Sequence, residues 1–200
     1  MARANRRHEE MSLTKQELRQ QLRARVKAIS PAQKKEFSRA VCERLRFQCA
    51  WGDARAVLFY SPLADELDLS PLIREALTAG CRVALPRFVP ETKEYAAFEI
   101  THPTDHTTVG TFNILEPSHH CPAFPLNRLD LVLVPGVGFD LVGHRLGRGQ
   151  GFYDRLLSSA SGVKCGVAFD EQLVEKIPAE THDVRLNCLL TPSQWLEFDR

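Results

Sequence analysis

The sequence predicts an α/β protein that folds as one domain around a mostly parallel sheet. Short apolar runs alternate with amphipathic segments along the chain, and this β-α-β order implies parallel strands joined by right-handed crossovers. The run from Leu129 to Val134 is rich in β-branched residues and Leu and ends in Pro-Gly, which is typical of a strand buried on both faces. Two hundred residues are enough for one substantial core, but too few for two ordinary domains without a clear linker.

Two helices are predicted in the N-terminal part of the chain, before the first strand. Residues 1–10 are polar and lack periodicity, so they are expected to form a disordered arm ahead of a domain spanning 11–200. A helix should begin at Thr14, where Glu17 completes a possible capping box and apolar residues recur with helical spacing. Ser30-Pro31 should end this helix and cap a second one over 32–50.

The remaining elements follow from apolar runs and their boundaries. Ser70-Pro71 is expected to provide the cap and first position of a helix that ends at Gly80. Residues 88–128 are harder to interpret and are expected to be mostly loop, although the stretch from Gly110 to Pro117 resembles a turn of a known family that is named below. The predicted strands cover 56–60, 82–85, 96–100, 129–134, 163–169 and 186–190, and further helices cover 152–157 and 171–177.

Composition restricts the class of partner and the compartment. A formal charge of +1 offers no general attraction for nucleic acid or a membrane surface, so any anion site must depend on local arginines. No apolar run approaches the ~20 residues that span a bilayer. Six cysteines occur without a Cys-x-x-Cys pair or a signal peptide, which indicates free thiols in a reducing cytoplasm. We therefore expect a cytoplasmic protein, and we expect it to be a monomer.

The stretch Arg145-Leu-Gly-Arg-Gly-Gln-Gly151 has the design of an anion-binding loop. Its glycines stand at alternate positions after a strand and before a helix, where open α/β sheets place ligands. Glycine lets backbone N–H groups converge on a phosphate, the helix dipole favours negative charge, and arginine adds planar donors. The alternative is a solvated Arg/Gly turn. Neither a P-loop nor a Gly-x-Gly-x-x-Gly opening a first βαβ unit is present.

Other polar clusters have both a functional and a structural interpretation. Lys15 and Arg19 lie one helical turn apart, which on spacing alone indicates solvated surface. The loop after the first strand carries Asp65, Glu66 and Asp68, which could bind a cation, accept N–H bonds from a ligand, or form a solvated turn. His119-His-Cys121 lacks a further ligand at supporting spacing, so a structural role is predicted there rather than a metal site.

Residues 135–154 resemble the signature of the 5-formyltetrahydrofolate cyclo-ligase family. That signature is Pro-Gly-x-x-Phe-Asp, two residues, then Gly-x-Arg-Leu-Gly-x-Gly-x-Gly-x-Tyr-Asp, and it matches this stretch nearly throughout. Lys15-Gln-Glu-Leu-Arg19 is similar to the Lys-x-x-Leu-Arg with which family members begin. Glu66, Pro86-Arg87 and Glu116-Pro117 are similar as well. The resemblance covers roughly residues 13–192 and is thin between 88 and 128.

The resemblance implies a three-layer, Rossmann-like α/β/α fold and specific roles. ATP would be bound by two groups of residues, which are Lys15, Arg19 and Arg145, and then Gly147, Arg148, Gly149, Gln150, Gly151, Phe152 and Tyr153. Lys15, Arg145 and Arg148 would be the catalytic cations, Asp154 would hold Mg²⁺, and Glu66, Asp68 and Arg87 would bind the folate. Tyr153 could pack on substrate or belong to the core. Asn187 stands where some members have a metal-associated Asp, so no second metal ligand is predicted.

The implied reaction is ATP-dependent conversion of 5-formyltetrahydrofolate to 5,10-methenyltetrahydrofolate, with release of ADP and phosphate and a requirement for Mg²⁺. A formamide carbonyl is a poor electrophile with a poor leaving group, and phosphorylation of its oxygen solves both problems. Positioning and charge stabilisation then suffice without a protein nucleophile.

Two alternatives use the same features. One is a sugar-phosphate or acyl-CoA binding enzyme, because this loop could bind any phosphate. The other is a non-catalytic protein that binds folate, or RNA through the basic arm. ATP-dependent turnover separates the cyclo-ligase hypothesis from both.

Overall fold

A seven-stranded sheet forms the centre of the protein. The computed structural model describes residues 13–110, 114–180 and 183–199, so the arm predicted for 1–10 and part of the turn predicted from Gly110 to Pro117 lie outside the described residues. The strand order is β12-β11-β9-β6-β1-β2-β3. Neighbours from β11 to β2 are parallel, whereas β3 and β12 pair antiparallel at the two edges. These strands are β1 (Ala56–Leu58), β2 (Arg82–Val89), β3 (Glu94–Ile100), β6 (Leu131–Val134), β9 (Val163–Val167), β11 (Cys188–Leu190) and β12 (Trp195–Glu197).

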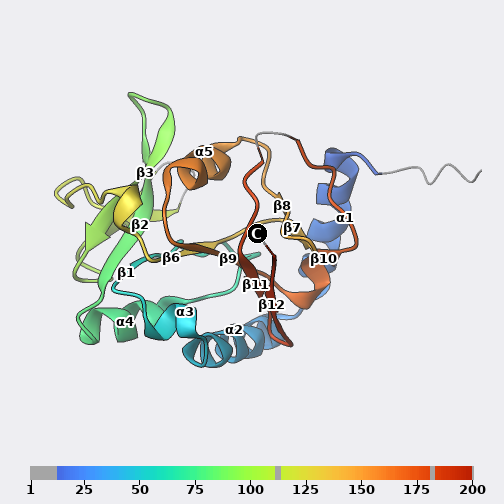
Figure 1. Ribbon diagram of the computed structural model, residues 1–200, viewed down its shortest axis with the longest axis horizontal. Helices are drawn as coiled ribbons and strands as arrows, with labels where there is room; N and C mark the ends of the chain where they lie inside the picture. The colour runs from blue at the N-terminus through green and yellow to red at the C-terminus, as the bar shows by residue number, and fades with distance from the viewer. Residues whose placement is uncertain (1–12, 111–113, 181–182, 200) are drawn as a thin grey trace, which may run out of the picture.

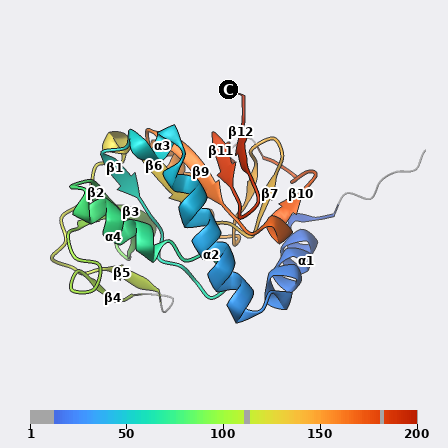
Figure 2. The same cartoon turned by 90° about the horizontal axis from the view of Figure 1, so that it is seen from below.

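Helices cover both faces of this sheet, so the predicted three-layer arrangement is confirmed. Figure 1 shows α2 (Pro31–Arg46), α3 (Cys49–Gly52) and α4 (Ser70–Thr78) on one face and α5 (Phe152–Ser159) on the other. Helix α1 (Lys15–Ala28) lies to one side, beside a small sheet of β7 (Gly138–Asp140), β8 (Arg145–Leu146) and β10 (Leu173–Val174), as Figure 2 also shows. A separate hairpin pairs β4 (Thr107–Val109) with β5 (Leu115–Pro117).

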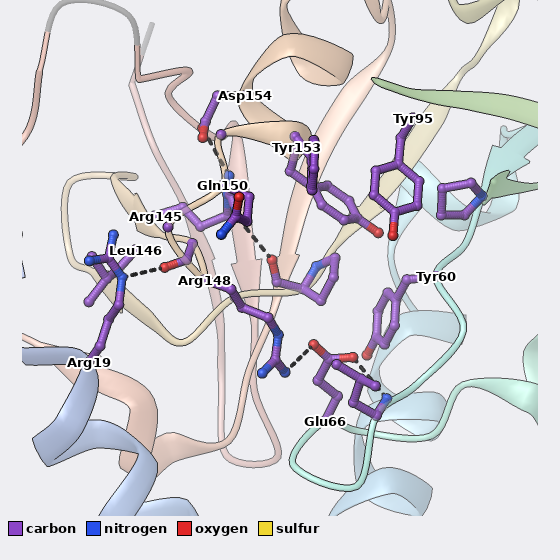
Figure 3. Close-up of a pocket in the computed structure, with 18 of the residues that line it drawn as sticks. Arg19, Tyr60, Glu66, Tyr95, Arg145, Leu146, Arg148, Gln150, Tyr153 and Asp154 are labelled. Atoms are coloured by element: carbon purple, nitrogen blue, oxygen red, sulfur yellow. Dashed lines mark hydrogen bonds and ion pairs between the residues drawn. The ribbon is translucent and has the colours of Figure 1, made fainter. Parts of the chain in front are cut away.

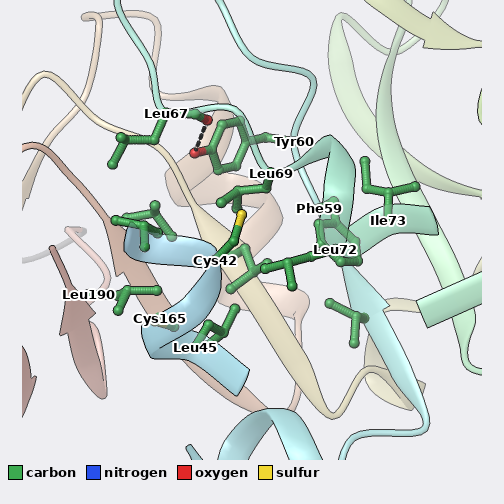
Figure 4. Packing of buried hydrophobic residues seen from close by; sticks show 14 of the residues in the cluster. Cys42, Leu45, Phe59, Tyr60, Leu67, Leu69, Leu72, Ile73, Cys165 and Leu190 are labelled. Carbon is green, nitrogen blue, oxygen red and sulfur yellow. Dashed lines mark hydrogen bonds between the residues drawn. The ribbon is translucent and has the colours of Figure 1, made fainter. Parts of the chain in front are cut away.

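Successive side chains along each strand point to opposite faces of the sheet, so the core consists of two apolar layers. Val57 and Leu131 face α2 and α4, whereas Leu58 and Val132 face α5, and all four are buried. Figure 4 shows the first layer, where Cys42 and Leu45 of α2 pack against Leu72 of α4. Because both faces of the central strands are covered, their sequences are continuously apolar rather than alternating.

The first two helices begin as their sequences predict. Thr14 and Glu17 form a reciprocal capping box at α1, and Ser30 and Gln33 form another at α2. These caps satisfy backbone N–H groups at the start of each helix.

The structure differs from five of the predicted elements. The second helix ends at Arg46 rather than Ala50, because Gln48 is extended and a separate turn brings Trp51 against Phe59. Ser70 is the first residue of α4 rather than its cap, since the Asp68 carboxylate accepts from the Ser70 N–H at 2.8 Å.

The other three differences concern the chain around the signature and residues 88–128. Residues 171–177 do not form the predicted helix. A short 3₁₀ turn (Asp170–Gln172) ends at Gln172, whose buried side chain donates to the Gly136 carbonyl at 2.8 Å, and the chain continues as β10 beside β7. The loop after β6 contains β7 and β8, and residues 88–128 contain the β4–β5 hairpin. In the part of the chain that the structure describes, no helix is both long and apolar enough to cross a membrane.

Candidate active site

A cavity of about 580 Å³ opens at the carboxyl ends of the central strands. Tyr60 and Ser61 after β1, Pro86 in β2, and Pro135 and Gly136 after β6 form part of its wall. Helix α1 and the loop before α5 complete it, and Figure 3 shows how their side chains converge. Open α/β sheets bind ligands in this position, and the volume suits small organic substrates.

The glycine loop over 147–151 leads directly into α5. Gly149 and Gly151 have φ values of 106° and 66°, a region that residues with a Cβ rarely adopt. Gly151 is the N-cap of α5, and no side chain caps the helix. The loop therefore presents the amino end of a helix to the cavity, which is the arrangement that binds phosphate groups.

Two arginines fix the first part of this loop. Arg19 of α1 donates from Nε to the Gly147 carbonyl at 2.8 Å, which joins the helix to the loop. A Cβ on Gly147 would lie 2.9 Å from Nη1 of Arg145, so glycine is needed there for close approach. The predicted grouping of these residues in one place is thus present in the structure.

Arg145 is buried beneath the loop and pairs with Asp154. Its Nη2 lies 2.9 Å from Asp154 Oδ1, and its Nη1 donates to the Pro135 carbonyl at 3.4 Å. Among the described residues, its buried Nε has no hydrogen-bond partner. The guanidinium also lies 5.6 Å from the Tyr153 ring centroid. Asp154 is therefore positioned by an arginine at the cavity wall, in the first turn of α5.

Arg148 contacts two carboxylates rather than lying free beside the glycines. It forms a fork with Asp65 through bonds of 2.7 and 3.2 Å, and it donates to Glu66 Oε1 at 2.8 Å. Burial raises the pKa of Glu66, although the charge of Arg148 opposes this effect. Burial also opposes the charge of Asp65, but the hydrogen bonds from Arg148 outweigh it and lower the Asp65 pKa. The glycine loop and the 61–69 loop are consequently tied together through Arg148.

Lys15 faces the cavity but already has two anionic neighbours. Its Nζ lies 2.8 Å from Glu180 and 2.9 Å from Asp183, and all three residues line the cavity. Partial burial disfavours the charged form of Lys15, yet the hydrogen bonds to these carboxylates outweigh it and raise the pKa. The ammonium group is therefore held in its charged form.

Aromatic side chains line the other part of the cavity. The Tyr60 hydroxyl donates to the Leu67 carbonyl at 2.8 Å. Tyr95 and Phe152 meet edge to face with ring centroids 5.3 Å apart. Burial raises the pKa of Tyr95 to about 12 and the pKa of Tyr153 still further, so both keep their hydroxyl protons near neutral pH. Flat apolar surface with a few fixed hydroxyl groups suits an aromatic heterocycle.

We call the two parts the cationic end and the aromatic end. The cationic end comprises Lys15, Arg19, Arg145 and the loop 147–151, and the aromatic end comprises Tyr60, Glu66, Tyr95, Phe152 and Tyr153. In Figure 3 Arg19 lies on one side, the three tyrosines lie on the other, and Arg148 meets Glu66 between them.

Two predicted substrate ligands do not line the cavity. The exposed Asp68 accepts hydrogen bonds from Ser70 at the start of α4. Arg87 stacks over the Phe98 ring at 3.5 Å and donates to the Ser118 carbonyl at 2.8 Å. Both residues organise backbone in this structure, because their polar groups are directed to neighbouring loops. Their proposed folate contacts have no support in this geometry.

The cavity also contains residues that sequence reasoning does not single out. Tyr95 lies at the cavity because the β2–β3 hairpin pairs it with Phe88. Glu180 and Asp183 lie at the cavity because they form ion pairs with Lys15. Asp65 belongs to the predicted acidic cluster, and the structure gives it the two-bond fork with Arg148. The acidic residues near position 183 are candidate partners for a lysine, but spacing alone does not reveal the pairing with Lys15.

Asn187 lies elsewhere in the fold. Its side chain accepts from the Lys164 N–H at 2.8 Å, between two strands of the main sheet. This bond gives the amide oxygen a structural role between these strands.

Comparisons with known proteins identify the same family along most of the chain. The family model described as "5-formyltetrahydrofolate cyclo-ligase family" matches residues 11–192. A 5-formyltetrahydrofolate cyclo-ligase of Escherichia coli K12 is 36% identical over 181 residues, which cover 88% of this chain and 100% of the relative. The Haemophilus influenzae protein of that name is 32% identical over 176 residues, covering 84% of this chain and 94% of the relative.

The fold has a close match among solved structures. The 5,10-methenyltetrahydrofolate synthetase of Aquifex aeolicus superposes with a TM-score of 0.84 at 31% identity, covering 94% of both chains. A match of this extent includes the central sheet as well as the chain around the cavity.

Proposed function

The chain belongs to the 5-formyltetrahydrofolate cyclo-ligase family, and we propose that its cavity holds ATP at the cationic end and 5-formyltetrahydrofolate at the aromatic end. The activity of the family is the ATP-dependent formation of 5,10-methenyltetrahydrofolate. One observation carries the assignment of the two ends. A single cavity connects a glycine loop at a helix amino end to a buried carboxylate surrounded by tyrosines.

The triphosphate is assigned to the loop 147–151 and the amino end of α5. Backbone N–H groups there supply donors that need no reorganisation, and Lys15 and Arg145 supply charge. Arg19 acts by holding the Gly147 carbonyl, and Gln150, which also lines the cavity, adds a side-chain amide. The support is that all these groups border the same space.

The pterin ring is assigned to the aromatic end. Glu66 can accept hydrogen bonds from ring N–H groups, and the side chains of Tyr60, Tyr95 and Tyr153 provide flat surface and hydroxyl groups. Arg148 keeps Glu66 within reach of the cationic end through its 2.8 Å contact. This placement would bring the formyl group toward the junction where Arg148 lies.

The reaction then needs two displacements at that junction. The formyl oxygen attacks the γ-phosphorus, and the bond from this phosphorus to the bridging oxygen breaks to release ADP. N10 attacks the formyl carbon, the carbon–oxygen bond breaks, and phosphate leaves with the oxygen while the N10 proton is lost. Arg148, Arg145 and Lys15 would stabilise negative charge on the transferring group, and a dry cavity strengthens that effect.

Asp154 is proposed as the protein ligand for Mg²⁺. It lines the cavity in the first turn of α5, beside the loop assigned to phosphates. Magnesium in nucleotide sites commonly takes one or two carboxylates together with phosphate oxygens, so a single aspartate fits this requirement. The ion would supply charge neutralisation, and Arg145 would orient the carboxylate through its 2.9 Å bond.

We also propose a cytoplasmic monomer. All six cysteines are free thiols, which supports a reducing compartment. The described cavity is formed within one chain, so it requires no side chain from a partner. Light scattering on the purified protein would test the monomer.

The decisive experiment follows product formation directly. The cyclised product is a conjugated amidinium that absorbs at longer wavelength than the formyl substrate. A new near-ultraviolet band and ADP should appear only when protein, ATP, Mg²⁺ and 5-formyltetrahydrofolate are combined. A folded protein that binds ATP but forms neither product nor ADP would overturn the proposed function.

A further inference from the structure

A group of metal-binding side chains lies near the base of the β4–β5 hairpin. Ligand atoms of His106, His120 and Cys121 all lie within 4.8 Å of one another. The rings of His106 and His120 meet edge to face with centroids 5.1 Å apart. None of these three residues lines the proposed active site. His120 and Cys121 belong to the sequence pattern His119-His-Cys121. His106, which directly precedes β4, lies beside them in the folded chain.

The backbone holds the two segments of this group together. Ser118 donates its N–H to the His106 carbonyl at 2.8 Å, and Cys121 donates its N–H to the Ser118 carbonyl at 3.0 Å. The Cys121 thiol also lies 3.5 Å from the His106 carbonyl oxygen. On the far side, the Pro122 carbonyl accepts from the Glu99 N–H of β3 at 2.9 Å. The ligands are therefore carried by a loop that is fixed to the main sheet.

We propose that His106, His120 and Cys121 form a binding site for a thiophilic transition-metal ion, with Zn²⁺ as the occupant. One thiolate and two imidazoles form a donor set that Zn²⁺ favours and that Mg²⁺ does not. Zinc–nitrogen bonds of about 2.0 Å and zinc–sulfur bonds of about 2.3 Å require ligand atoms roughly 3.3 to 3.8 Å apart. Small side-chain rotations would bring the observed group to that spacing.

Neighbouring residues suit the surroundings of such a site. The Thr101 N–H donates to Nδ1 of His106 at 3.3 Å, and Thr101 Oγ1 lies 3.5 Å from the same nitrogen, so Thr101 orients this imidazole ring. His102 stands four residues before His106, a common spacing of zinc ligands, and the two ring centroids are 5.6 Å apart. His102 or a water molecule would complete four-coordination.

The site would stabilise the hairpin rather than take part in ligation chemistry. Arg87 of β2 donates to the Ser118 carbonyl, so the same loop is already joined to the central sheet. A bound ion would cross-link the segment before β4 to the segment after β5. The predicted consequence is a raised melting temperature of the whole protein in the presence of Zn²⁺.

The test is calorimetric titration of the chelator-treated full chain with Zn²⁺, accompanied by Co²⁺ absorption spectra. We expect one Zn²⁺ per chain and a thiolate-to-cobalt charge-transfer band. Cys121→Ser and His120→Ala should each weaken Zn²⁺ binding roughly 10²-fold, and Cys121→Ser should abolish the band. His120 is exposed, so its variant separates a lost ligand from a lost fold.

Two other residues provide matched controls. His119 is an exposed histidine next to the site, and Cys49 is an exposed thiol far from it in the sequence. His119→Ala and Cys49→Ser should bind Zn²⁺ as the unaltered protein does. Absence of stoichiometric binding would overturn the proposal. Binding that Cys121→Ser and His120→Ala leave unchanged would overturn it as well.

Discussion

The two ends of the cavity are built in different ways. The cationic end draws its residues from two short stretches, 15–19 and 145–151, and its shape depends on local backbone conformation at Gly149 and Gly151. The aromatic end collects Tyr60, Glu66 and Tyr95 from separate loops and strands, with Phe152 and Tyr153 from α5. The residues proposed for phosphate binding thus come from two short stretches of sequence, whereas the surface proposed for the pterin exists only after the sheet has formed.

Arg148 contacts residues of both ends of the cavity. It belongs to the glycine loop, yet its guanidinium contacts Asp65 and Glu66. Partial burial opposes the charge of Arg148, but the bonds to both carboxylates raise its pKa above the usual range for arginine. A residue that serves both ends should affect both substrates when it is changed.

The largest expected effect is that of Arg148→Ala. It removes a positive charge from the proposed junction and leaves the buried Glu66 carboxylate without its arginine, so kcat should fall roughly 10³-fold. The KM for each substrate should rise in steady-state kinetics. Arg148→Lys keeps the charge but loses the fork, and it should recover only part of the rate. A change confined to the KM for ATP would place Arg148 at the cationic end alone.

Lys15→Ala should have the next largest effect and should be specific to one end. Loss of a charged donor to the transferring phosphoryl group should lower kcat roughly 10²-fold, with little change in the KM for the folate substrate. Glu180 and Asp183 would also lose this cation, so the variant should bind ATP more weakly in calorimetry. Lys27→Ala, at the exposed last turn of the same helix, is the matched control and should keep full activity. An equal loss in Lys27→Ala would assign the effect to the charge of the helix as a whole.

Most of the fold could be predicted because its signals are local or periodic. Capping boxes at Thr14 and Ser30 and the apolar run at 131–134 place α1, α2 and β6 within a few residues. The elements that sequence analysis misses depend on distant partners. The chain after Gln172 is a strand because β7 lies beside it, and β12 is a strand because β11 offers an edge.

The residues of the candidate site also differ in whether their place depends on local sequence or on distant partners. The glycine loop and Arg145 could be placed from sequence because their motif is contiguous. Lys15 is placed only by the family resemblance, because its spacing alone indicates solvated surface. Tyr95 could not be placed from sequence, because its place depends on the register of the β2–β3 hairpin. Asp68 and Arg87 remain predictions, and in this structure both hydrogen-bond to nearby backbone outside the cavity.

Glu66→Gln tests the aromatic end and should produce opposite changes in function and stability. The amide keeps the size of the side chain but cannot carry the negative charge, so recognition of the pterin N–H groups should weaken. We expect the KM for the folate substrate to rise roughly tenfold while the KM for ATP changes little. Steady-state kinetics with each substrate varied would measure this. A change in the ATP dependence alone would move Glu66 to the other end of the cavity.

The stability of the same variant should depend on pH. Because burial raises the pKa of Glu66, the folded protein binds this proton more tightly than the unfolded chain. Glu66 therefore costs no stability below the usual glutamate pKa of about 4.3, and the cost grows as pH rises through the raised value. Glu66→Gln should therefore raise the melting temperature at pH 7, and should raise it by much less at pH 4. Equal shifts at both pH values would contradict this account of Glu66.

Arg19→Gln should have the smallest effect, because Arg19 holds the glycine loop rather than the reacting atoms. Its Nε donates to the Gly147 carbonyl at 2.8 Å, and one such bond from a charged donor is worth roughly 1.5 kcal/mol. The KM for ATP should therefore rise about tenfold while kcat changes less than threefold. Arg25→Ala, an exposed arginine of the same helix, removes the same charge without touching the loop and serves as the control. If Arg19→Gln instead lowers kcat as strongly as Lys15→Ala, then Arg19 contacts the transferring phosphate itself. The transferring phosphate would then lie within reach of both Lys15 and Arg19, which line the same cavity.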